Sequence, residues 1–105
     1  ILFATNSDKI QASSNEIISQ IVDAMKQSSD LKLKIIGHTD SDGDDNANMT
    51  LSKKRANAVK MKMVSLGISP SRLQTDGKGE SEPIESNDDN AGKAKNRRVV
   101  FIKTN

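Results

Sequence analysis

The sequence contains no cysteine, tryptophan or tyrosine, and its only aromatic rings are those of Phe3 and Phe101. Without cysteine, the chain can form no disulfide, thiolate nucleophile or zinc–thiolate site. So few rings leave almost no platform for stacked bases, and we therefore expect no nucleic-acid partner. Every apolar run is far shorter than the roughly 18 residues of a membrane-spanning helix, so we expect no insertion into a membrane. The core must therefore be aliphatic.

The length of 105 residues is typical of one domain, which we expect to span residues 1–105. The chain begins with Ile1 and shows no signal peptide, which suggests a domain excised from a longer protein. The formal net charge is +2, but the charge is uneven along the chain. Residues 1–50 hold four Lys or Arg and eight Asp or Glu, whereas residues 51–105 hold twelve and six.

Hydrophobic periodicity predicts two long helices. Apolar residues at helical spacing predict the first over residues 14–27, with Ser13 and Glu16 as a capping box. The second is predicted over residues 47–66, with Gly67 as the residue that ends it.

Shorter apolar segments predict the strands. The predicted strands cover residues 1–5, 31–37, 73–76 and 98–103. The last is apolar on both faces, which is typical of a strand inside a sheet. The stretch between the last two strands is interpreted as a long ordered loop pinned by Ile84, with one helical turn over residues 91–95. This order of elements predicts an α/β (α+β) sandwich, with helices packed on one or both faces of a mixed sheet.

No motif for catalysis or metal binding is complete in this sequence. Asp40, Asp42 and Asp44 alternate as in a calcium loop, but the glycine and glutamate that such a loop requires are missing. We therefore interpret this acidic loop as a solvated turn before a helix. His38 is the only histidine, and no motif activates a serine. We expect a binding module rather than an enzyme, with no cofactor and no metal.

One strand-to-helix junction does gather a carboxylate, an amide and a guanidinium. Asp40 follows a predicted strand, and Asn48 and Arg55 share a face of the next helix because they lie two turns apart. An aspartate can bind an ammonium group and an arginine can bind a carboxylate, so such a crevice suits a zwitterion. From spacing alone, an internal Asp–Arg salt bridge is the more common outcome.

Several separate blocks agree in order and spacing with a known family. Over nearly its whole length the chain resembles the OmpA-like C-terminal domain, which anchors envelope proteins to peptidoglycan. The blocks that carry this resemblance are Gly37-His-Thr-Asp40, Asn48, Leu51-Ser52-x-x-Arg55-Ala56, Val59, Leu66-Gly67-Ile68, Ser71-Arg72-Leu73, Gly77-x-Gly79-Glu80-x-x-Pro83-Ile84, Asn87, Gly92 and Asn96-Arg97-Arg98-Val99.

The resemblance implies a β/α/β/α/β-β fold and a non-catalytic site for peptidoglycan. It also implies a location in the periplasm, as part of an outer-membrane or envelope-anchored protein. In the family, an Asp and an Arg that match Asp40 and Arg55 bind the diaminopimelate residue of the stem peptide. The full set of implied site residues is Asp40, Arg55, Asn48, Arg97, Thr39 and Leu51. Arg98 is not included, because neighbours on a strand point to opposite faces.

Two positions depart from the family pattern. Ala4 stands where a carboxylate is common, so the ammonium end of a ligand would be held less firmly. Lys93 replaces an arginine, which keeps the charge but loses the bidentate fork. An OmpA-like fold whose site has drifted to a protein–protein role is the alternative, and a wall hydrolase is a third hypothesis. The sequence also leaves a homodimer open.

Overall fold

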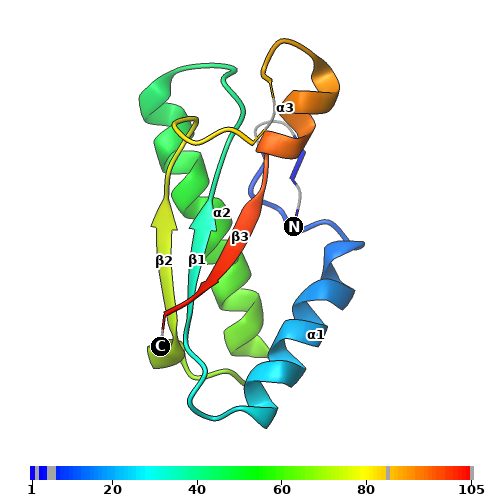
Figure 1. Cartoon of the computed structure of the whole chain (residues 1–105), viewed down its shortest axis with the longest axis vertical. Coiled ribbons are helices and arrows are strands. Elements are labelled where there is room, and N and C mark those ends of the chain that lie inside the picture. Colours follow the sequence, from blue (N-terminus) through cyan, green and yellow to red (C-terminus); the bar gives the residue numbers. More distant parts are fainter. Residues whose placement is uncertain (2, 5–6, 85, 105) are drawn as a thin grey trace.

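The computed structural model describes residues 1, 3–4, 7–84 and 86–104. Figure 1 shows two long helices beside a small sheet, with a short helix at one end of the molecule. The elements are α1 (Ser14–Gln27), β1 (Leu33–Gly37), α2 (Asp45–Ser65), the 3-10 helix η1 (Pro70–Arg72), β2 (Leu73–Gly77), α3 (Asn90–Asn96) and β3 (Val99–Lys103). The predicted mixture of helices and a mixed sheet is confirmed.

The three strands form one sheet in the order β2-β1-β3. β1 pairs with β2 in parallel, with Leu33 opposite Leu73, and with β3 antiparallel, with Leu33 opposite Lys103. Because β1 and β2 are parallel, their carboxyl ends lie at the same end of the sheet. The loops that follow these strands therefore meet there, beside the start of β3.

One face of the sheet carries the core. Leu33 and Ile35 of β1 and Leu73 of β2 point to this face and pack in one cluster with both long helices. The buried helical side chains of this cluster are Ile18, Val22 and Met25 of α1 and Ala56, Val59 and Met63 of α2. Both long helices thus cover the same face of the sheet.

The ends of the helices follow from local chemistry. The carboxylate of Asp44 accepts a hydrogen bond from the Ala47 amide at 3.2 Å and so caps α2. Gly67 follows α2 with a φ of 107°, a conformation that favours glycine. α1 covers the predicted residues, but the predicted capping box is wrong. Ser13 itself has helical backbone angles, and its side chain makes no capping hydrogen bond.

The first predicted strand lies partly outside the described residues, and Ile1, Phe3 and Ala4 form no strand. The backbone of Ile1 still pairs with Val99, and the Phe3 amide donates to the Arg97 carbonyl at 2.9 Å. The N-terminal segment therefore runs along the start of β3.

β3 is the outer strand of the described three-strand sheet, whereas its alternation predicts an interior strand; beyond that sheet, the described residues Ile1 and Phe3 pair only with the start of β3. Val99 faces the core, but Ile102 on the opposite face is 49% exposed. On that second face Val100 is half-buried beside the buried Ile36, so only the end of β3 at Ile102 is an open apolar surface.

The loop after β2 is fixed by an amide side chain and not by Ile84, whose side chain is 60% exposed, contrary to the prediction. The Ile84 amide donates to Oδ1 of Asn96 at 2.8 Å, and Nδ2 of Asn96 donates to Asn87 at 2.9 Å. Asn96 is fully buried at the end of α3, so it connects this loop to α3.

Candidate functional site

Asp40 and Arg97 form an ion pair at the end of the sheet where β1 and β2 finish. Nη1 of Arg97 lies 2.8 Å from Oδ2 of Asp40, and Oδ1 of Asp40 accepts a hydrogen bond from the Asp42 amide at 3.0 Å. The Asp40 side chain is 6% exposed and that of Arg97 is 16% exposed. The loop predicted to be solvated therefore begins with a buried, paired carboxylate, whereas Asp42 is exposed.

Thr39 and Asn48, both predicted for the site, fix the backbone around Asp40. The Thr39 hydroxyl donates to the Asp40 carbonyl at 2.9 Å. Nδ2 of Asn48 donates to the Asp42 carbonyl at 3.0 Å and lies 3.4 Å from the Asp40 carbonyl. Both side chains are buried. These contacts hold the loop in the conformation that presents Asp40 to Arg97.

Arg55 is fully buried behind this loop. Its Nε donates to the Ser7 carbonyl at 2.8 Å, its Nη1 to the His38 carbonyl at 2.9 Å and its Nη2 to the Ala4 carbonyl at 2.9 Å. Its guanidinium lies 5.2 Å from the centre of the Phe3 ring. Arg55 therefore joins the N-terminal segment to β1 and α2.

The charge of Arg55 lies close to the ion pair. Burial lowers the pKa of Arg55 to about 10, and the negative charge of Asp40 opposes this shift. The guanidinium thus stays charged at neutral pH. Among the described residues, no hydrogen bond joins Arg55 to Asp40, so the salt bridge of Asp40 is with Arg97.

Close packing brings the start of α2 to the end of β1. A Cβ on Gly37 would overlap the carbonyl oxygen of Ser52, so only glycine allows this approach. The Ser52 hydroxyl accepts a hydrogen bond from the Gly79 amide at 3.0 Å. Leu51, also predicted for the site, is half-buried on the same stretch of α2.

Two charged residues at this end were missed as site residues by the sequence analysis. Lys93 of α3 lies 3.0 Å from Asp42, which connects the acidic loop to α3. Glu80 accepts a hydrogen bond from Asn48 at 3.3 Å, and the neighbouring Asp45 raises the pKa of Glu80. The sequence motif Gly77-x-Gly79-Glu80 could have indicated Glu80 as a site residue. The replacement of the family's arginine by Lys93 could have indicated Lys93.

His38 and Arg98 lie opposite each other where β1 ends and β3 begins, and the His38 amide donates to the Arg98 carbonyl at 2.8 Å. Both side chains are buried, and within the described part of the chain His38 Nδ1 and Arg98 Nε have no hydrogen-bond partner. Burial and the charge of Arg98 lower the pKa of His38 to about 4. Nη2 of Arg98 donates to the Glu82 carbonyl at 2.9 Å, so Arg98 holds a loop and not the Asp40 carboxylate.

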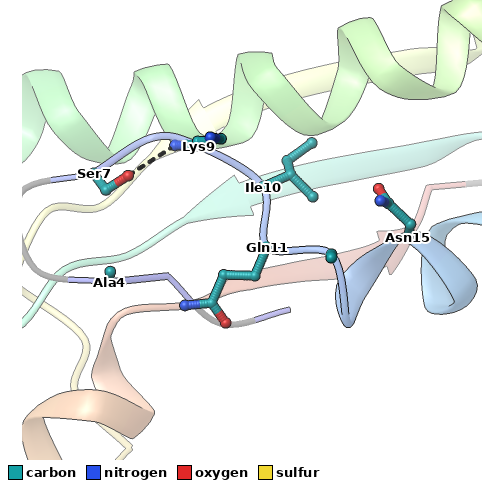
Figure 2. A pocket seen from close by; sticks show the side chains of 7 residues that line it. Ala4, Ser7, Lys9, Ile10, Gln11 and Asn15 are labelled. Atoms are coloured by element: carbon teal, nitrogen blue, oxygen red, sulfur yellow. Dashed lines mark hydrogen bonds between the residues drawn. The ribbon is translucent and has the colours of Figure 1, made fainter.

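Two hollows flank the site. One of about 370 Å³ is lined by Asp45, Met49, Lys78, Gly79, Glu80 and Ser81. The other, of about 460 Å³, lies between the N-terminal segment and the start of α1 and is lined by Ala4, Ser7, Lys9, Ile10, Gln11, Ala12 and Asn15 (Figure 2). Arg55 binds the carbonyls of Ala4 and Ser7, two of the residues that line this larger hollow.

The site can bind a charged ligand. The Asp40 carboxylate and the Arg97 guanidinium face each other, and the Asn48 amide lies beside them. No group of three metal-binding side chains occurs within residues 1, 3–4, 7–84 and 86–104. None of the helices in that same part of the chain is long and apolar enough to cross a membrane.

Known proteins resemble this chain in sequence. Outer-membrane lipoprotein YfiB of Pseudomonas aeruginosa is 32% identical over 102 residues, which are 97% of this chain and 61% of that protein. Peptidoglycan-binding protein ArfA of Mycobacterium tuberculosis is 33% identical over 102 residues, which are 97% of this chain and 31% of that protein. The chain spans 29% to 61% of the length of such curated relatives.

The fold also resembles solved structures. The peptidoglycan-associated lipoprotein from Burkholderia pseudomallei superposes with a TM-score of 0.96 at 26% sequence identity, over 99% of this chain and 88% of that one. The predicted OmpA-like fold is therefore confirmed. The model of the OmpA family matches residues 2–97, which include every predicted site residue. By sequence and by fold, this chain belongs to the OmpA family.

Proposed function

We propose that this domain binds peptidoglycan non-covalently through the diaminopimelate residue of the stem peptide. The observation that carries this proposal is the Asp40–Arg97 pair, in which a carboxylate and a guanidinium lie 2.8 Å apart at one end of the sheet. The side-chain end of diaminopimelate carries an ammonium and a carboxylate on one carbon, which is the complementary arrangement. Membership of a family that includes a protein named for peptidoglycan binding supports this choice of ligand.

In this proposal the ligand replaces the contact between Asp40 and Arg97. The ammonium group binds Asp40, and the carboxylate binds Arg97, whose planar fork suits a two-point contact. The sequence-based hypothesis gives the carboxylate to Arg55. Because Arg55 is fully buried and bonded to three backbone carbonyls, we propose that it positions the loop around Asp40 instead.

The proposed role is anchoring and not catalysis. Asp40 and Arg97 supply charge and hydrogen bonds but no activated nucleophile. Binding would attach the protein that contains this domain to the cell wall, in the periplasm of a bacterium. A similar protein is named as an outer-membrane lipoprotein, which supports this location.

Sedimentation with purified sacculi tests the proposal. Asp40→Asn and Arg97→Gln each remove one charge of the pair, so we expect the affinity to fall by a factor of roughly 30. Asp44→Asn is the matched control, because it removes an exposed charge from the same loop and retains a capping side chain. A folded Asp40→Asn variant that binds sacculi as well as the wild type would contradict the proposal.

A further inference from the structure

We infer that the outer face of α2 is a second docking surface, which binds the anionic peptidoglycan polymer beyond the Asp40–Arg97 site. This inference rests on the proposed function. The surface, called here the basic face, consists of Lys53, Lys54 and Lys60 together with Asn57 and Met61.

The basic face carries lysines that form no ion pair in the described part of the chain. The sequence has no Asp or Glu from residue 46 to residue 75. Lys53 and Lys54 are exposed and Lys60 is partly exposed, and none of the three forms an ion pair with a described residue. Lysines elsewhere do pair: Lys34 and Lys78 with Asp76, and Lys93 with Asp42. The basic face is therefore a patch of lysines without ion pairs to the described residues.

The geometry of α2 directs this patch to solvent, and the patch begins at Lys53, which lies against Gly77 at the end of β2. The opposite side of the helix, with Val59 and Met63, is fully buried in the core. Lys53 and Lys60 are two turns apart, so they share one face and span about 10 Å of the helix axis. α2 runs from the end of the molecule that carries α3 toward the opposite end (Figure 1). Asn48 at its start belongs to the site, so one helix connects the site to the basic face.

Peptidoglycan has the complementary charge. Its stem peptides repeat along the polymer, and each carries free carboxylates on its glutamate and diaminopimelate residues. A lysine is a flexible point charge without fixed directional demands, so it suits a repeating polyanion better than one defined ligand. Anionic phospholipids would be attracted by the same lysines. We favour the wall, because Met61 is the only large apolar side chain of the basic face, whereas a helix lying in a membrane needs an apolar face.

Two variants with equal loss of charge separate the basic face from a general charge effect. Lys53→Gln/Lys60→Gln removes two lysines of the basic face, and Lys26→Gln/Lys103→Gln removes two exposed lysines from other elements. Calorimetry measures binding of a soluble diaminopimelate muropeptide, and sedimentation measures binding of intact sacculi at low and high ionic strength. We expect Lys53→Gln/Lys60→Gln to bind the muropeptide like the wild type but to bind sacculi roughly tenfold more weakly at low ionic strength. This difference should shrink at high ionic strength, and the control should match the wild type.

Other outcomes would overturn the inference. Unchanged binding to sacculi would remove any role for the basic face in wall binding. Loss of binding to phosphatidylglycerol vesicles, with sacculus binding unchanged, would assign the basic face to a membrane instead. An equal loss for muropeptide and sacculi would place the lysines in the first site. A wild-type protein that binds neither muropeptide nor sacculi would contradict the proposed function itself.

Discussion

Arg55 donates from three nitrogens to three backbone carbonyls, and the single ammonium group of a lysine cannot reproduce that geometry. In Arg55→Lys, the carbonyls of Ala4 and Ser7 lose charged donors. Each such hydrogen bond contributes about 1.5–3 kcal/mol. We expect the free energy of unfolding, measured with urea, to fall by about 3 kcal/mol. Lys54→Ala, at the exposed neighbouring position, should change it by less than about 0.5 kcal/mol. Equal stability of Arg55→Lys and the wild type would show that these contacts are dispensable.

His38 makes stability depend on pH. Its pKa is about 4 in the folded protein, against an ordinary value of 6.5, because it is buried beside Arg98. As the pH falls, His38 of the unfolded chain is therefore protonated before His38 of the folded chain. The contribution of neutral His38 to stability is complete above pH 6.5 and is lost as the pH falls toward 4. Between pH 7.5 and pH 5 we expect His38 to cost the wild type about 2 kcal/mol in the free energy of unfolding. Urea titrations of His38→Gln should lack this loss, and a wild type with the same pH profile as His38→Gln would contradict the assignment.

The residues of the candidate site could be proposed from the sequence, but their contacts could not. Residue types and family blocks pointed to Asp40, Asn48 and Arg97. The contact between Asp40 and Arg97 joins residues that are 57 positions apart, so no local spacing indicates it. The partners of Arg55 are backbone carbonyls, and because every residue has one, the sequence cannot identify them. A hypothesis based on spacing pairs Asp40 with Arg55, whereas the salt bridge of Asp40 is with Arg97.

At the scale of elements, the two long helices begin in different ways. Asp44 accepts a hydrogen bond from the Ala47 amide, whereas Ser13 makes no capping bond. Asp44→Ala should therefore lower the free energy of unfolding by about 1 kcal/mol. Ser13→Ala should leave it nearly unchanged. Thermal or urea unfolding of the two variants measures the difference, and equal losses would mean that Ser13 does cap α1 in solution.

Elements with strong periodicity could be predicted, and those set by tertiary contacts could not. α1 matches the predicted residues 14–27, because its apolar positions repeat at helical spacing. The position of β3 at the sheet edge depends on how the strands assemble. The pattern of apolar residues along β3 cannot predict the order of the strands in the sheet. Ile84 was expected to anchor its loop, but the Asn96 side chain does so through a backbone contact. Hydrophobicity alone could not identify that anchor.

At the scale of the whole molecule, the domain is elongated, with extents of 41 × 24 × 19 Å. The site forms at one end, where the N-terminal segment, the loops after β1 and β2, and the start of β3 meet. Several of these segments carry no regular structure, so their arrangement depends on contacts such as the bond from Arg97 Nε to the Phe3 carbonyl at 3.0 Å. Ligand binding at this end should therefore stabilise the whole fold.

A thermal shift assay measures that coupling. A ligand present at a hundred times its dissociation constant stabilises a protein by about 2.7 kcal/mol. For a domain of this size we expect the muropeptide to raise Tm by roughly 10 °C. Calcium at millimolar concentration should leave Tm unchanged, because the acidic loop lacks the glycine and glutamate of a calcium site. A shift of several degrees with calcium would contradict that interpretation.

The most direct measurement is a calorimetric cycle that combines a protein variant with a ligand variant. The four combinations pair wild type and Arg97→Gln with a diaminopimelate muropeptide and with the same muropeptide amidated at the side-chain carboxylate. If Arg97 binds that carboxylate, amidation should lower the affinity of the wild type at least tenfold and that of Arg97→Gln very little, which gives a clear coupling energy. Strictly additive losses would contradict the contact between Arg97 and that carboxylate, and with it the central claim of the proposed function.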